Sequence, residues 1–148
     1  QRATEHHTTE LCELVADAVL DALPESERLG HPERRLPHVL SLRIPGVVGE
    51  TLMLRCNERG VAFSTGSACH GADAAEHDDE AERPPARVRE QKPDNHVLAA
   101  IGLDQRAARE VVRLSFAADN TVAEVEDAAA ILVEEARSLK DLAPRGRR

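Results

Sequence analysis

A cysteine at position 69 ends a run of small residues, Ser64-Thr65-Gly66-Ser67-Ala68, and is followed by His70. Such a run has no packing period and predicts a loop, where a thiol can be exposed and its thiolate stabilised. A thiolate is a nucleophile, and His70 is the adjacent candidate base. Two structural alternatives stay open: Cys69 lies on a surface loop by chance, and His70 is simply a solvent-exposed imidazole.

Arg113 is the second candidate. It interrupts an apolar run, Val111-Val112-Arg113-Leu114-Ser115-Phe116, which predicts a strand. The planar guanidinium can bind a carboxylate through two parallel hydrogen bonds. The alternative is a charged residue on the outward side of an edge strand. Because the arginine breaks an otherwise apolar segment, we favour the binding role.

The remaining cysteines and the lysines point away from other chemistries. Cys12 and Cys56 fall at helical spacing from apolar residues and are expected to be core thiols. An odd number of cysteines without a CxxC pair, and no charged and then apolar leader, favour reduced thiols in a cytoplasm. Neither Lys92 nor Lys140 lies in an apolar context suited to a Schiff base. Cys69, His70 and a later histidine lack the paired spacing of a zinc site, so no metal is expected.

The elements that must position Cys69 and Arg113 follow from periodicity. We expect three short strands covered by helices on one face, that is, a two-layer α+β domain. The predicted helices span residues 8–23, 50–57, about 97–101, about 105–109 and a long final segment opened by the capping box Thr121 to Glu124. The predicted strands span residues 38–44, 61–63 and 111–116.

Composition limits the function classes. The chain has 148 residues, enough for one domain, with 41% hydrophobic and 31% charged residues. No run of about 18 apolar residues is present, so no membrane partner is expected. The net charge of −8 argues against direct binding of nucleic acid. Residues 70–94 are acidic and then contain Pro84-Pro85, which predicts a solvated, mobile loop.

The run Ser64-Thr65-Gly66-Ser67-Ala68-Cys69 closely resembles the active-site cysteine loop of the cysteine desulfurases, pyridoxal-phosphate enzymes of the NifS and IscS type in the class V aminotransferase family. Further blocks resemble that family in its order along the chain. They are Leu36-Pro37-His38-Val39-Leu40-Ser41, Val48-Gly49-Glu50-Thr51-Leu52, His96-Val97-Leu98-Ala99-Ala100-Ile101-Gly102-Leu103, Val112-Arg113-Leu114-Ser115, and Asn120-Thr121 with Glu124 and Val125. Two departures are His38, where the family commonly has Asn, and Ala117-Ala118-Asp119 in place of a Gly-containing turn.

The resemblance implies a reaction. Cys69 would be the nucleophile that attacks the sulfur of an L-cysteine substrate bound to pyridoxal phosphate, leaving L-alanine and a persulfide on the enzyme. His70 would be the candidate base beside it, and Arg113 would bind the substrate carboxylate. The sulfur would then pass to an acceptor protein, which could be an iron–sulfur scaffold, a tRNA-thiolating enzyme or a DNA-modifying partner.

The resemblance covers only the carboxy-terminal small domain of a fold-type I pyridoxal-phosphate transferase, here residues 1–148 with the acidic loop 70–94. The family's large domain, which binds the cofactor, is absent from this sequence, so we expect the chain alone to be inactive. A large domain or second subunit would be its partner, in a homodimer when the enzyme is complete. Two alternatives stay open: a selenocysteine lyase, given Ala68-Cys69-His70, and a non-catalytic acceptor that carries a persulfide on Cys69.

Overall fold

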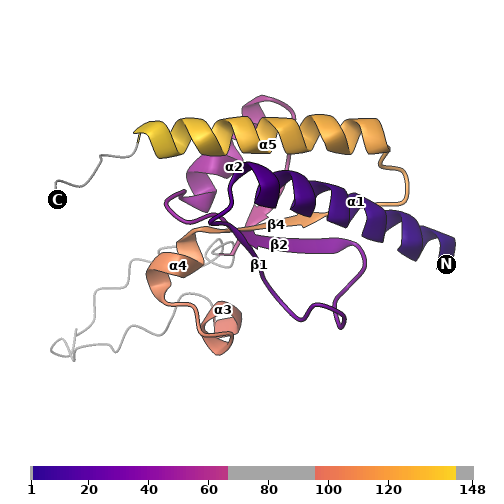
Figure 1. Cartoon of the computed structure of the whole chain (residues 1–148), viewed down its shortest axis with the longest axis horizontal. Coiled ribbons are helices and arrows are strands. Elements are labelled where there is room, and N and C mark those ends of the chain that lie inside the picture. The colour runs from indigo at the N-terminus through magenta and orange to yellow at the C-terminus, as the bar shows by residue number, and fades with distance from the viewer. Residues whose placement is uncertain (1, 67–95, 143–148) are drawn as a thin grey trace, which may run out of the picture.

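The computed structural model describes residues 2–66 and 96–142. Within them the chain runs as a long helix, two strands, a helix, a strand, two short helices, a strand and a second long helix (Figure 1). The bounds are α1 Arg2–Ala22, β1 Glu27–Arg28, β2 Val39–Arg43, α2 Gly49–Glu58, β3 Ser64–Thr65, α3 His96–Ala100, α4 Gln105–Arg109, β4 Val111–Ser115 and α5 Val122–Leu142.

The strands form one antiparallel sheet in the order β1-β2-β4-β3. In the central pair, Leu40 of β2 lies opposite Leu114 of β4, and Leu42 lies opposite Val112. Side chains alternate between the two faces of a strand, so these four apolar residues share one face. That face is the buried one, because each of the four is at most 6% exposed.

The helices α1, α2 and α5 cover the apolar face, as Figure 1 shows with α5 and α1 above the strands. The predicted two-layer α+β class is therefore confirmed. The buried residues of the long helices recur at three and four residue steps, as an amphipathic helix requires. The largest fully buried side chains are Leu11, Leu40, Leu42, Ile44, Leu52 and Leu132.

The predicted number of three strands is wrong, because four are present in the described residues. The pair Glu27–Arg28 has no apolar alternation, and it becomes a strand because its backbone pairs with Arg43 and Leu42. The strand predicted at 61–63 lies instead at Ser64–Thr65. The N–H of Val61 donates to the Cys56 carbonyl at 2.9 Å and so closes α2, which delays the extended segment.

Helix boundaries follow local chemistry closely. The capping box opens α5 as predicted: Glu124 Oε2 accepts from the N–H and hydroxyl of Thr121 at 2.9 Å each. These bonds, the backbone bond first, hold the pKa of Glu124 below its usual range. Helix α2 ends before Gly60, whose φ of 85° suits glycine at that position. Helix α1 starts at Arg2 rather than near Thr8, because polar residues extend it without needing an apolar face.

Candidate functional site

The predicted nucleophile and its neighbour lie outside the described residues. Cys69, His70 and the acidic segment 70–94 fall within residues 67–95, so their roles stay predictions. The structure does place the residues that lead to them. Strand β3 is the last element before that segment, and its Thr65 is 5% exposed. The chain therefore enters the segment 67–95, which contains Cys69, from a strand that is paired within the sheet.

Gly66 fixes the direction in which the chain leaves β3. Its N–H donates to the Val111 carbonyl at 3.2 Å. A Cβ at this position would lie 2.6 Å from Leu98 Cδ1 and 3.3 Å from the Ala108 carbonyl oxygen. Real Cβ atoms do not approach other atoms at the shorter distance, so a side chain here would displace Leu98 of α3. Because residue 66 is glycine, the backbone can pass close to both α3 and α4.

Arg113 lies on the sheet face opposite the long helices. It lies opposite Ser41 of β2 and opposite Ser64 of β3, in one row across three strands. Its Nε donates to Ser64 Oγ at 3.2 Å, and the same hydroxyl donates to the Arg113 carbonyl at 3.3 Å. The guanidinium is exposed, as the outward position on β4 predicts. Its location suits a group that binds a molecule from outside this domain.

The charge of Arg113 is not neutralised by a described carboxylate, in contrast to the other arginines of the sheet. Arg28 binds Glu13 at 2.6 Å. Arg43 binds Glu27 at 2.6 Å and Glu110 at 2.9 Å, and these hydrogen bonds raise the pKa of Arg43 above its usual value. Among the residues that the structure describes, Arg113 is the sheet arginine without an ion pair to a carboxylate.

The other two cysteines are core thiols, which confirms the sequence prediction. Cys12 is 1% exposed and Cys56 is 0% exposed. Burial raises the pKa of each thiol to about 11. The Cys12 thiol also donates to the Pro37 carbonyl, with sulfur and oxygen 3.4 Å apart. Buried and protonated thiols are poor nucleophiles, so Cys69 is the remaining candidate among the three cysteines of the chain.

The described residues do not fit pyridoxal phosphate. The cofactor needs an amine for its Schiff base, and the lysine in the described ranges is Lys140 on α5. Burial lowers the pKa of its ammonium, but Nζ is paired with Glu25. Helix α5, which carries Lys140, covers the apolar face of the sheet, and Arg113 lies on the other face. The described residues therefore offer no amine that suits a Schiff base with the cofactor.

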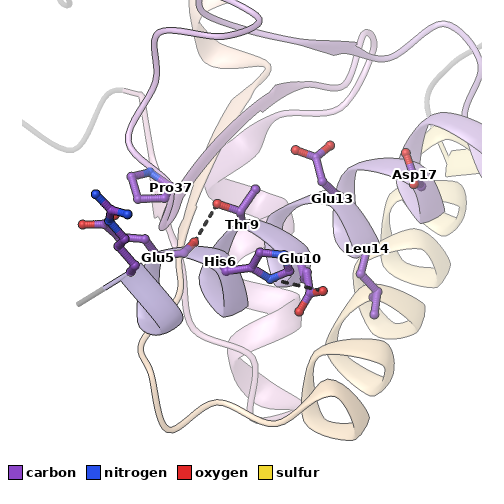
Figure 2. Close-up of a pocket in the computed structure, with 9 residues that line it drawn as sticks. Glu5, His6, Thr9, Glu10, Glu13, Leu14, Asp17 and Pro37 are labelled. Atoms are coloured by element: carbon purple, nitrogen blue, oxygen red, sulfur yellow. Dashed lines mark hydrogen bonds and ion pairs between the residues drawn. The ribbon is translucent and has the colours of Figure 1, made fainter.

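A hollow along α1 carries several carboxylates but does not coincide with the predicted site (Figure 2). Its acidic side chains are Glu5, Glu10, Glu13 and Asp17. His6 Nδ1 lies 3.4 Å from a Glu10 oxygen, and Glu13 binds two arginines. Across residues 2–66 and 96–142, no three His, Cys, Asp or Glu side chains are grouped to hold a metal ion. None of the helices in those ranges is long and apolar enough to cross a membrane.

Sequence reasoning missed the contact between Ser64 and Arg113. Ser64 belongs to the small-residue run, but it lies 49 positions from Arg113 in sequence. Their contact depends on the register of β3 against β4, and no sequence signal specifies that register for a strand of two residues.

A sequence model of the family Aminotransferase class-V matches residues 1–127. The putative cysteine desulfurase IscS 1 of Bacillus subtilis is 33% identical over 117 residues, which cover 78% of this chain and 26% of that protein. The cysteine desulfurase IscS of Methanosarcina thermophila is 26% identical over 152 residues, covering 97% of this chain and 33% of that protein.

Solved structures show the same fold. A NifS-like protein superposes with a TM-score of 0.65 at 22% identity, over 90% of this chain and 28% of that one. The NifS-like protein from Rickettsia africae ESF-5 gives a TM-score of 0.62 at 18% identity, over 93% of this chain and 29% of that one. The chain thus spans about a quarter to a third of the length of the relatives it matches. It belongs to the class-V aminotransferase family, and its relatives there include cysteine desulfurases of the IscS and NifS type.

Proposed function

We propose that this chain is the carboxy-terminal small domain of a pyridoxal-phosphate-dependent cysteine desulfurase, which takes sulfur from L-cysteine and leaves L-alanine. The observation that carries the proposal is the exposed, unneutralised guanidinium of Arg113 beside β3, the strand that leads in sequence to Cys69. An anion-binding group and a candidate nucleophile are the two elements that this reaction requires from the small domain.

In the proposed reaction, Arg113 holds the carboxylate of the substrate. A carboxylate presents two oxygens in a plane, and a guanidinium presents matching pairs of N–H groups. The Ser64 hydroxyl already occupies Nε, so the side chain is oriented before substrate arrives. Orientation before binding lowers the entropy cost of the contact.

Cys69 is the proposed nucleophile, on which the persulfide forms. Its thiolate attacks the sulfur of the substrate cysteine, so that a sulfur–sulfur bond forms while the carbon–sulfur bond breaks. The electron pair of the broken bond remains with the substrate carbon, which takes up a proton and becomes the methyl group of alanine. His70, its neighbour in sequence, is the proposed base that favours the thiolate. The persulfide then passes its outer sulfur to an acceptor protein.

The cofactor and the remaining catalytic groups are proposed to lie in a large domain, in a homodimeric enzyme. Two facts support this division: the described residues of this chain do not fit the cofactor, and the relatives are three to four times longer than their matched parts. We therefore expect the 148-residue chain alone to gain no visible absorbance when pyridoxal phosphate is added.

The complete enzyme that contains this chain provides the test. After incubation with L-cysteine, mass spectrometry of its peptides should show the mass of one extra sulfur atom on Cys69, and alanine should accumulate. Cys69→Ser should abolish both signals, while Cys56→Ala should leave the persulfide in place. Alanine formation that continues unchanged in Cys69→Ser would refute the proposed nucleophile.

A further inference from the structure

We propose that Ser64 is a positioning residue that makes Arg113 bind its carboxylate end-on, through the two terminal nitrogens of the guanidinium. This inference rests on the proposed function, in which Arg113 binds the substrate carboxylate. It assigns to Ser64 a specific task that the small-residue run alone does not reveal.

The geometry of the pair is set by the sheet. Ser64 lies directly opposite Arg113 in the register of β3 and β4. The hydroxyl makes two bonds with the same residue: it accepts from Nε at 3.2 Å and donates to the backbone carbonyl at 3.3 Å. Because one hydroxyl is held at both ends, it fixes the arginine side chain relative to its own backbone.

A guanidinium has two kinds of edge that match a carboxylate. The side edge consists of Nε and one Nη, and the end edge consists of both Nη atoms. Ser64 occupies the Nε proton, which removes the side edge from use. The pair of Nη groups remains for the carboxylate, and because Ser64 fixes Nε, the carboxylate is bound there with a defined orientation.

Arg43 lies on the same face of the sheet as Arg113, but its guanidinium is bonded by carboxylates instead of a hydroxyl. Its Nε is held by the carboxylate of Glu110 at 2.9 Å, and its Nη1 by the carboxylate of Glu27 at 2.6 Å. Carboxylates in these places orient the arginine and neutralise it together. The hydroxyl of Ser64 orients Arg113 and leaves its charge in place, which is the combination that anion binding requires.

Ser41 gives a matched control. It lies opposite Arg113 on the other side, in β2, and it shares the sheet face with Ser64. The structure shows no side-chain hydrogen bond between Ser41 and Arg113, both of which lie in the described residues. Ser41→Ala therefore removes the same hydroxyl from the same row of the sheet without touching the arginine side chain.

The test has one readout that does not depend on catalysis. In the full chain with ¹⁵N-labelled arginine, the Nε–H resonance of Arg113, assigned by its loss in Arg113→Lys, should exchange slowly with water. Ser64→Ala should increase its exchange rate about tenfold, the size expected for loss of one hydrogen bond, whereas Ser64→Thr and Ser41→Ala should not. Titration with propionate should shift the Nη resonances of the wild-type side chain while Nε–H changes little.

Kinetics of the complete enzyme give the second readout. Ser64→Ala should raise the KM for L-cysteine by about threefold to tenfold with a smaller change in kcat, and Ser64→Thr should restore it. Equal exchange rates in wild type and Ser64→Ala, or a propionate shift on Nε–H as large as on Nη, would overturn the inference. If the wild-type enzyme forms no alanine, the proposed function fails, while the exchange and propionate measurements still decide the role of Ser64.

Discussion

Labelling of the three thiols with iodoacetamide separates the proposed nucleophile from the core cysteines. Cys12 and Cys56 are at most 1% exposed, and burial raises the pKa of each to about 11. At pH 8, a thiol with a pKa of about 11 is ionised in about 1 molecule in 1000, whereas a thiol with an ordinary pKa of about 8.5 is ionised in about 1 in 4. Ionisation alone therefore slows alkylation of the core thiols about 200-fold, since the thiolate is the reacting form.

Burial slows the core thiols further, because the reagent reaches them only when the structure opens. Opening of a packed core requires partial or complete unfolding, which is populated in a small fraction of molecules. We expect Cys69 to be alkylated at least about 200-fold faster than Cys12 and Cys56 in the native chain. In a denaturing concentration of urea, all three should react at rates within a few fold of one another.

Peptide mass spectrometry over a time course measures each rate separately. Native labelling of Cys56 at a rate near that of Cys69 would refute the argument, because it would mean that the α2 thiol is neither buried nor protonated. Slow labelling of all three would instead refute an accessible nucleophile at position 69. Cys69→Ser is the control. This chain should fold and keep only the two slowly reacting thiols, which shows that the fast reaction belongs to Cys69.

Three further predictions concern stability, all measured by urea unfolding. Because the folded pKa values of Cys12 and Cys56 are raised, the unfolded chain loses these protons first as pH rises. The free energy of unfolding should therefore fall by about 3 kcal/mol per thiol between about pH 9 and pH 11. The same fall in the double variant Cys12→Ala/Cys56→Ala would contradict this. Gly49→Ala should destabilise by about 1–3 kcal/mol despite the better helix propensity of alanine, since its Cβ would lie 2.8 Å from the Val111 carbonyl oxygen; unchanged stability would contradict it. Thr121→Ala should cost about 1 kcal/mol by removing the capping box, and no loss would disprove the cap's contribution.

The fold was predictable where the periodicity is strong. The apolar positions of the two long helices and of β2 and β4 lie on the buried side, and the capping box at Thr121 opens α5 as its pattern predicts. The short strands were not predictable, because Glu27–Arg28 and Ser64–Thr65 contain too few residues to show alternation. Tertiary pairing with β2 and β4 creates them, and such pairing is not encoded within either segment.

The candidate site was predictable only in part, because a local sequence pattern reveals Arg113 but only tertiary pairing brings Ser64 to it. Arg113 is conspicuous in sequence because it breaks an apolar run, and the structure places it on the exposed face. Its oxygen partner is inconspicuous, because serine is common in loops and nothing local distinguishes Ser64 from Ser67. The absence of a described carboxylate beside Arg113 is likewise a property of the assembled sheet.

Strand β4 carries Arg113 and is bonded both to Ser64 and to Gly66, where the described part of the chain leaves β3. Along β4, Arg113 is bonded to Ser64, and the Val111 carbonyl accepts from the Gly66 N–H. Since alternate residues of β4 hold Ser64 and Gly66, those two residues cannot shift relative to Arg113 without breaking the β3 ladder. The sheet therefore fixes where Arg113 lies relative to Gly66, the last described residue before the segment that contains Cys69.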